Sequence, residues 1–458
     1  IKELGIREIV MCIALCKRLA RSLSLVLTGL LIGFCWVPTT MGARYDYVDI
    51  NSPALRKIPT AIPVFKSLGN TTDEAQISSQ AADMLSDMLV FTGYFKMLDR
   101  GAFLIDPKSP NIIASQIQFK NWTGIGAELL VTGGVVFDEG LLTMELRLFD
   151  TFKAQLLVGK RYKGRKEDMR RMIRRFSSEV IFTLTGNRGL FDSKIAFVST
   201  VEGKKEIFVC EFDGKDPVRM THHKNISLSP ALSSDLQWIA YTSYVKGKPD
   251  LYIRNMQSKL GAVVAQKGVN IAPSWLPGEL KLAATLSFEG DPEIYLLTET
   301  GKIINRLTQS NGIDISAAWS PDGKKIAFVS KRAGSPQIYI KEIASGQTRR
   351  LTFEGKNNTQ PTWSFRGDQI AYTAMDKDGL NIRVIGVEGE GLIQLTHNSG
   401  DNESPSWSPD GSLIVFSSNR EGTSKIYIMT AYGTDQRRLL DLPGKQSEPQ
   451  WSGIAMTQ

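Results

Sequence analysis

The sequence predicts a two-domain chain, in which an N-terminal α/β domain with a mixed sheet precedes a six-bladed β-propeller of four-stranded blades. One observation is a repeat of about 44 residues that fills the second half of the 458-residue chain. Another is the irregular alternation of strand-like and helix-like segments before that repeat. We therefore expect a signal peptide at 1–43, an α/β domain at 44–185, a linker at 186–194 and the propeller at 195–458.

The first segment has the three parts of a cleavable signal peptide. Residues 22–37 carry no charge, and the basic residues Lys17, Arg18 and Arg21 precede them. The small pair Gly42-Ala43 stands where cleavage is expected. This pattern predicts export, with the mature chain beginning after residue 43.

Two alternatives to cleavage after Ala43 remain open. A retained membrane anchor would need about 20 apolar residues, and this run has 16. A lipoprotein signal would modify Cys35, although the bulky Phe34 stands where such sites need a small residue. Met11 would begin a better-proportioned signal, which makes it a plausible start site.

The segment before the repeat predicts the element order β-α-β-α-β-β-β-α. In order, we expect a strand at 58–68, a helix from a capping box at 71–74 to Gly93, a strand at 95–98, a weak helix within 109–125, strands at 128–137, 141–149 and 155–162, and a helix at 167–185. The last helix has four arginines on one face, Arg170, Arg171, Arg174 and Arg175. We interpret them as a solvated face, with contact to anionic lipid or a partner as the alternative.

An arm at 44–53 precedes this domain. Its Tyr45, Tyr47, Val48 and Ile50 suit a strand that docks on its own domain or on the sheet edge of a partner.

The repeat marks one strand of each blade. An apolar residue followed by Ala or Val recurs at intervals of 43 or 44 residues, at Ile195, Ile239, Leu282, Ile326, Ile370 and Ile414. Between two strands, Ser320-Pro321-Asp322-Gly323 and its copy at 408–411 have the composition of a type I turn. Four strands fit into 44 residues, as in a propeller blade.

A tryptophan stands seven residues before most of these strands, and Leu232 replaces it once. The tryptophans are Trp275, Trp319, Trp363, Trp407 and Trp451. A large flat side chain at one fixed position fills the space between blades, so we expect a structural role. Because Trp451 has no strand after it and Ile195 has no tryptophan before it, the C-terminal strand should complete the first blade.

Composition argues against several function classes. The net charge of +8, of which +3 belongs to residues 1–43, is too small to indicate nucleic-acid binding. Three histidines and the single mature cysteine, Cys210, argue against a metal site, a cofactor site or a disulfide framework. A peptidase that follows a propeller would need Gly-x-Ser-x-Gly, which is absent, and His222 and His397 occupy variable loops. We expect no catalysis.

The combination of leader, α/β domain and propeller resembles the TolB family. The resemblance extends across the mature chain. It depends on the turn residues above, on Leu184-Thr185-Gly186 and on the terminal Pro449-Gln450-Trp451-Ser452. Leu232 and the Ser364–Gly367 turn depart from the pattern. The resemblance implies a monomeric periplasmic scaffold of the Tol–Pal system, which maintains outer-membrane integrity and invagination during division.

The resemblance also implies two partners. The propeller would bind Pal, the peptidoglycan-associated lipoprotein, and the arm would communicate with TolA; other outer-membrane or peptidoglycan-associated proteins are further candidates. We expect the Pal site in loops that precede each Pro-x-Trp and converge on one mouth of the channel. The candidate residues are Asn270, Ala272, Asp314, Ser316, Thr359, Gln360, Glu403, Ser404, Ser447 and Glu448. The alternative function is an exported propeller that binds or processes a small sugar or peptide.

Overall fold

The computed structural model describes residues 56–69, 72–104, 112–187 and 189–453. The expected signal peptide and the arm at 44–53 lie outside these ranges. In the described part, no helix is both long and apolar enough to cross a membrane.

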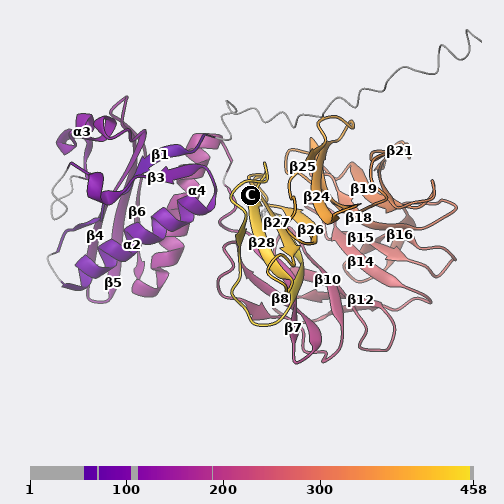
Figure 1. Ribbon diagram of the computed structural model, residues 1–458. Coiled ribbons are helices and arrows are strands. Elements are labelled where there is room, and N and C mark those ends of the chain that lie inside the picture. The colour runs from indigo at the N-terminus through magenta and orange to yellow at the C-terminus, as the bar shows by residue number, and fades with distance from the viewer. Residues whose placement is uncertain (1–55, 70–71, 105–111, 188, 454–458) are drawn as a thin grey trace, which may run out of the picture. The chain divides into compact units, whose positions relative to one another are not determined.

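The N-terminal part is a mixed sheet with helices packed on it (Figure 1). Its elements are β1 (Ile58–Ala61), β2 (Lys66–Ser67), α2 (Thr72–Phe91), β3 (Phe95–Met97), α3 (Phe119–Gly124), β4 (Leu129–Asp138), β5 (Leu141–Asp150), β6 (Gln155–Arg165) and α4 (Met169–Thr185). The strand order is β3-β1-β4-β5-β6, with β2 paired to β4. β1 runs parallel to β3 and β4, whereas β4, β5 and β6 are antiparallel. The expected mixed sheet is confirmed.

Helical periodicity accounts for the two long helices. Ile77, Ala81 and Leu85 of α2 are fully buried in the same core as Ile173 of α4. Helix α4 ends at Gly186, which has a left-handed φ of 75° and donates its N–H to the carbonyl of Phe182. Glycine adopts this conformation without a steric cost, which explains where the helix stops.

Three expected elements differ in extent. The strand expected at 58–68 is divided into β1 and β2, because Pro63 lies between them and cannot donate a ladder hydrogen bond. The helix expected within 109–125 is the six-residue α3. β6 continues to Arg165, past the expected end at residue 162.

The second part has six four-stranded antiparallel sheets, which confirms the predicted propeller (Figure 1). The first blade joins β30 (Gln446–Trp451) to β7 (Lys194–Val201), β8 (Lys204–Glu211) and β9 (Val218–Arg219). The second and third are β10 (Ser227–Leu232), β11 (Trp238–Ser243), β12 (Asp250–Asn255), β13 (Gly261–Val264), and β14 (Asn270–Trp275), β15 (Lys281–Leu286), β16 (Glu293–Thr298), β17 (Ile303–Arg306). The fourth and fifth are β18 (Asp314–Trp319), β19 (Lys325–Ser330), β20 (Gln337–Glu342), β21 (Thr348–Arg350), and β22 (Asn357–Trp363), β23 (Gln369–Asp376), β24 (Gly379–Gly386), β25 (Ile393–Gln394). The sixth is β26 (Asn402–Trp407), β27 (Leu413–Ser418), β28 (Lys425–Thr430) and β29 (Arg437–Arg438).

The ring closes as the sequence predicts. β30 pairs antiparallel with β7, so the C-terminal strand lies beside the first propeller strand. Beyond the ladder, the Lys194 N–H donates to Ser452 Oγ over 3.0 Å and the Ser452 N–H donates to the Lys194 carbonyl over 2.9 Å. Closure by one shared blade removes the open sheet edge that an incomplete ring would have.

The five tryptophans lie at the ends of the first strands of their sheets and are 3–8% exposed. The indole N–H of Trp275, Trp319 and Trp363 donates to a carbonyl of the preceding blade, on Ala231, Ser274 and Ala318. Each of these side chains therefore packs and bonds across a blade junction.

Two of the four α4 arginines have partners in the first blade. Arg170 forms a bidentate ion pair with Asp213 at 2.8 and 2.9 Å, and Arg174 pairs with Glu211 at 3.1 Å. Arg171 pairs within its own segment with Asp168. The arginine face is thus only partly a solvated face, because the last residue of β8 and the turn after it supply carboxylates to it.

Candidate functional site

The first strands of the six sheets share a bulge. They are the inner strands, because consecutive ones (β10, β14, β18, β22, β26 and β30) contact each other around the ring. In each, the pairing with the next strand shifts register, and one non-glycine residue has a φ of 50–56°. These residues are Ser229, Ala272, Ser316, Gln360, Ser404 and Glu448. A bulge re-aims the backbone, so its amide is free to bond outside its own sheet.

The predicted partner-binding residues lie in these inner strands, which corrects their expected place in loops. The loops end one or more residues earlier, because the ladder with the second strand already begins at Asn270, Asp314 and their counterparts. Asn270 and Asp314 are fully buried. Asn270 Nδ2 donates to the Gln266 carbonyl, and Asp314 accepts from Arg332 at 2.7 Å. These two side chains hold the neighbouring loops and do not present a surface to a partner.

The bulge residues connect one blade to the next. The amides of Ala272 and Ser316 each donate over 3.3 Å to a threonine of the preceding blade, Thr242 and Thr285. Between the fifth and sixth blades the Ser404 amide donates in the same way to Thr373 at 3.0 Å, and the Gln360 side chain adds two further bonds. Gln360 Oε1 accepts from the Ser404 amide at 2.9 Å, and Gln360 Nε2 donates to Ser404 Oγ at 2.8 Å. The bulges therefore fix the spacing of the blades around the channel.

Glu448 makes the corresponding link at the closing blade. Its Oε2 accepts from the backbone N–H of Ser229 at 2.7 Å and from the Ser229 hydroxyl at 3.2 Å. Burial raises the pKa of Glu448, and the nearby Glu403 carboxylate adds to the effect, while the Ser229 hydrogen bonds and Lys205 oppose it. Glu448 is thus primarily a structural acceptor.

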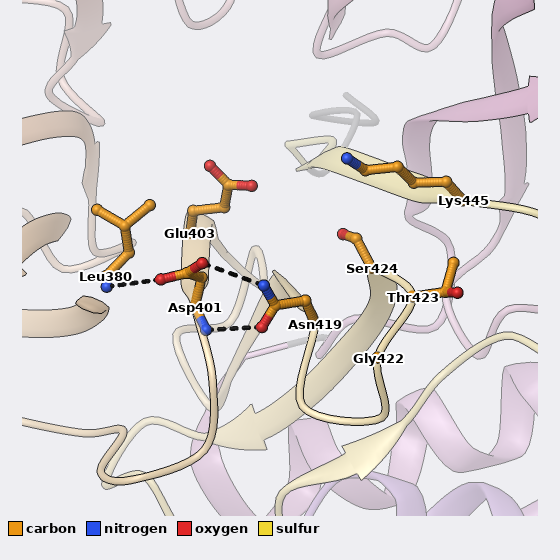
Figure 2. Close-up of a pocket in the computed structure, with 8 residues that line it drawn as sticks. All are labelled: Leu380, Asp401, Glu403, Asn419, Gly422, Thr423, Ser424 and Lys445. Atoms are coloured by element: carbon orange, nitrogen blue, oxygen red, sulfur yellow. Dashed lines mark hydrogen bonds between the residues drawn. The ribbon is translucent and has the colours of Figure 1, made fainter. Parts of the chain in front are cut away.

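A pocket of about 400 Å³ opens beside Glu403 (Figure 2). It lies between loops of the fifth, sixth and first blades, and it is lined by Leu380, Asp401, Glu403, Asn419, Gly422, Thr423, Ser424 and Lys445. The Leu380 amide donates to Asp401 Oδ1 at 3.1 Å, while Asn419 accepts from the Asp401 amide at 2.7 Å and donates to Asp401 Oδ2 at 3.1 Å. Asp401 is therefore held as a fixed wall of the pocket.

Glu403 and Lys445 are the charged groups of the pocket that remain available. In the described part of the chain, neither side chain forms a hydrogen bond or an ion pair. Figure 2 shows the two side chains on different segments that line the pocket, Glu403 beside Asp401 and Lys445 on the far side of Ser424. The pocket thus offers a carboxylate and an ammonium group to a polar ligand or to a protein segment.

Two observations on the described residues concern metal binding and thiol reactivity. These residues contain no group of three or more His, Cys, Asp or Glu that could hold a metal ion. Cys210 is buried, and this burial raises the pKa of its thiol, so the reactive thiolate is disfavoured.

Sequence reasoning found Glu403 but missed Asp401, Asn419 and Lys445. Asn419 and Lys445 come from segments 18 and 44 positions away from Asp401, so no local pattern connects them. The one available signal was the 44-residue period, which aligns loops of successive blades.

Both parts of the chain are similar to known protein families. The family model described as the TolB beta propeller domain matches residues 182–455, and the TolB amino-terminal domain matches residues 46–157. The Tol-Pal system protein TolB of Desulfosudis oleivorans is 56% identical over 287 residues, which are 63% of this chain and 65% of that protein. A TolB homolog of Chlorobium chlorochromatii is 41% identical over 59% of this chain and 60% of its own length. These matches thus span a little less than two thirds of either relative.

A solved structure extends the comparison over most of the chain. The crystal structure of TolB from Acinetobacter baumannii aligns with a TM-score of 0.74 and 27% identity. It covers 87% of this chain and 97% of that structure.

Proposed function

The chain belongs to the TolB family, and on that premise we propose that it is a noncatalytic periplasmic scaffold of a Tol–Pal system. The observation that carries the proposal is the match of both family models, because it includes the α/β domain as well as the widely shared propeller. The Tol-Pal name of the Desulfosudis relative supports the same system. On this reading the protein serves outer-membrane integrity and invagination during division.

We propose that Pal binds at the channel mouth that contains the Glu403 pocket. At this mouth Lys445 is exposed and Glu403 is half-buried, and neither side chain has a partner among the described residues. Hydrogen bonds at the bulges connect the inner strands behind them. A rigid backbone of this kind holds the Cα positions of Glu403 and Lys445, so that binding has to order only their side chains. Ser447 and Thr359 are half-buried in neighbouring inner strands and complete the proposed surface.

The second proposed partner is TolA, through the arm at 44–53. Tyr45, Tyr47, Val48 and Ile50 would add as a strand to TolA. This segment lies outside the described residues, so its sequence pattern and the family resemblance are its support.

Calorimetric titration of residues 44–458 with the periplasmic domain of Pal tests the first partner, and a chain lacking 44–53 separates the arm from the site. Tight binding to both chains would support a propeller site. Absence of binding to both, checked by a second method, would reject Pal as the partner and favour the small-ligand alternative, for which the pocket near Glu403 is the obvious place.

The charge reversal Glu403→Lys should weaken Pal binding at least about tenfold. It should not lower the thermal midpoint, because Glu403 loses no hydrogen bond or ion pair and the change removes its repulsion of Glu448. Glu390→Lys is the matched control, since Glu390 is exposed, forms no ion pair with a described residue and lies in the turn between β24 and β25, at the opposite end of its blade. Equal affinities for both variants would remove this mouth from consideration. Reversal of Glu448 is a poor test, because it would also break the Ser229 hydrogen bonds.

A further inference from the structure

Strand β6 is an open edge of the α/β sheet. The strand order ends at β6, and no described strand pairs with its outer side. β6 has 11 residues, and all of its side chains are exposed or half-exposed, as in Leu156 at 46%. The Arg165 N–H at the end of β6 donates to Asp168 Oδ2 at 3.0 Å, so the template that this edge offers to another strand lies before Arg165.

The edge carries basic side chains on the sheet face that the long helices leave open. Leu142, Met144 and Leu146 of β5 are fully buried in the core that contains α2 and α4. The alternate positions point to the other face, where Glu145 and Thr143 pair with Arg161 and Lys163 of β6.

In β4, β5 and β6 this face has two carboxylates, Glu145 and Asp138, and four cations, Arg147, Arg161, Lys163 and Arg165. Arg147 and Arg161 both contact Glu145, and they hold the pKa of its carboxyl below the ordinary range. Lys163 and Arg165 form no ion pair with any described residue. Leu141, which pairs with Arg165, is 44% exposed, so this end of the hairpin is uncovered. At this end Lys163 and Arg165 face one carboxylate, Asp138, which stands opposite Leu141, so the β6 edge keeps an excess of positive charge.

We propose that β6 is a docking edge for an acidic, extended segment of a partner protein, which adds to the sheet as a further strand. The free backbone edge supplies hydrogen bonds, and Lys163 and Arg165 supply charge complementarity to carboxylates on alternate positions of that segment. Basic residues on an edge also discourage pairing between identical edges, so the same side chains exclude a second copy of this strand.

A defined probe tests the edge. It is a fluorescent peptide that matches the 11 residues of β6 and alternates Glu with Thr or Val. The control peptide has the same charge but Pro at the Thr and Val positions, so it cannot join a ladder. Binding to residues 44–458 is followed by anisotropy, and hydrogen exchange reports protection of the β6 amides.

We expect the alternating peptide to bind and to slow exchange in β6, and the double variant Lys163→Glu/Arg165→Glu to weaken binding about tenfold or more. Lys204→Glu/Lys302→Glu, at exposed propeller positions, carries the same charge change and should bind as the unmodified chain does. Thermal unfolding checks that both variants are folded.

Three results would overturn the proposal. If the alternating peptide did not bind at concentrations up to about 1 mM, the basic residues would serve only to prevent unwanted pairing of this edge. Equal binding of the Pro peptide would show unspecific charge attraction. Binding to phosphatidylglycerol vesicles that depends on Lys163 and Arg165, without binding of the peptide, would indicate a lipid surface instead.

Discussion

The indole of Trp363 joins two blades of the propeller. The side chain is 8% exposed and packs in one core with Ala327 and Val329 of the preceding blade. Its indole N–H donates to the Ala318 carbonyl at 3.0 Å. Trp363→Ala should lower the free energy of unfolding by roughly 3–5 kcal/mol, because it leaves a cavity and an unpaired carbonyl. Denaturant unfolding measures the change, with Phe365→Ala as the control, since Phe365 is 45% exposed. An unchanged midpoint for Trp363→Ala would contradict the structural role.

The raised pKa of Glu448 predicts a pH dependence of stability. The folded chain retains this proton to higher pH than the unfolded chain, whose carboxyl titrates near 4.5. Its contribution to stability is therefore complete below that pH and is lost as the pH rises through the folded pKa. Glu448→Gln keeps an acceptor for Ser229 and should remove this part of the decline. Denaturant midpoints measured from pH 4.5 to neutrality test this expectation, and identical slopes for the two chains would contradict it.

At the scale of elements, the Ser-x-Asp-Gly turns close the first hairpin of a blade. Ser408 Oγ donates to Asp410 Oδ1 at 2.6 Å and accepts from the Leu413 N–H at 2.9 Å, and Ser408 is 1% exposed. Ser408→Ala leaves a buried N–H without its acceptor, so we expect a loss of about 1–3 kcal/mol in unfolding free energy. The same change at exposed Ser258 should have little effect, and equal effects at both positions would show that the turn network is dispensable.

Patterns that repeat made most elements predictable. The period of 44 residues located the propeller strands and the closure by Trp451, because each blade has the same internal contacts. Features that occur at one position of a strand, such as a proline or a bulge, were harder to predict from the sequence. Pro63 divided one expected strand, and the bulges moved the predicted partner-binding residues from loops into strands. The Glu403 pocket could be anticipated only in part, because Asn419 and Lys445 reach it through tertiary structure.

At the scale of the whole molecule, the ring depends on a strand that is distant in sequence. β30 is the inner strand of the first blade and carries Trp451, which is 3% exposed. The indole N–H of Trp451 donates to Ser193 Oγ at 2.7 Å. Residues 446–452 therefore bind the C-terminal end of the propeller to its first strand, about 250 positions earlier in the chain.

Deletion of 446–458 should leave β7 with a free edge and abolish a single cooperative unfolding transition. Calorimetry and light scattering would show a lowered or broadened transition together with self-association through that edge. Deletion of 454–458 alone is the control and should unfold as the full chain does. Ser452→Ala is a milder variant, which removes only the hydrogen bond from the Lys194 N–H and should cost about 1 kcal/mol. If the chain without 446–458 remained monomeric with an unchanged transition, the shared blade would not be what closes the ring.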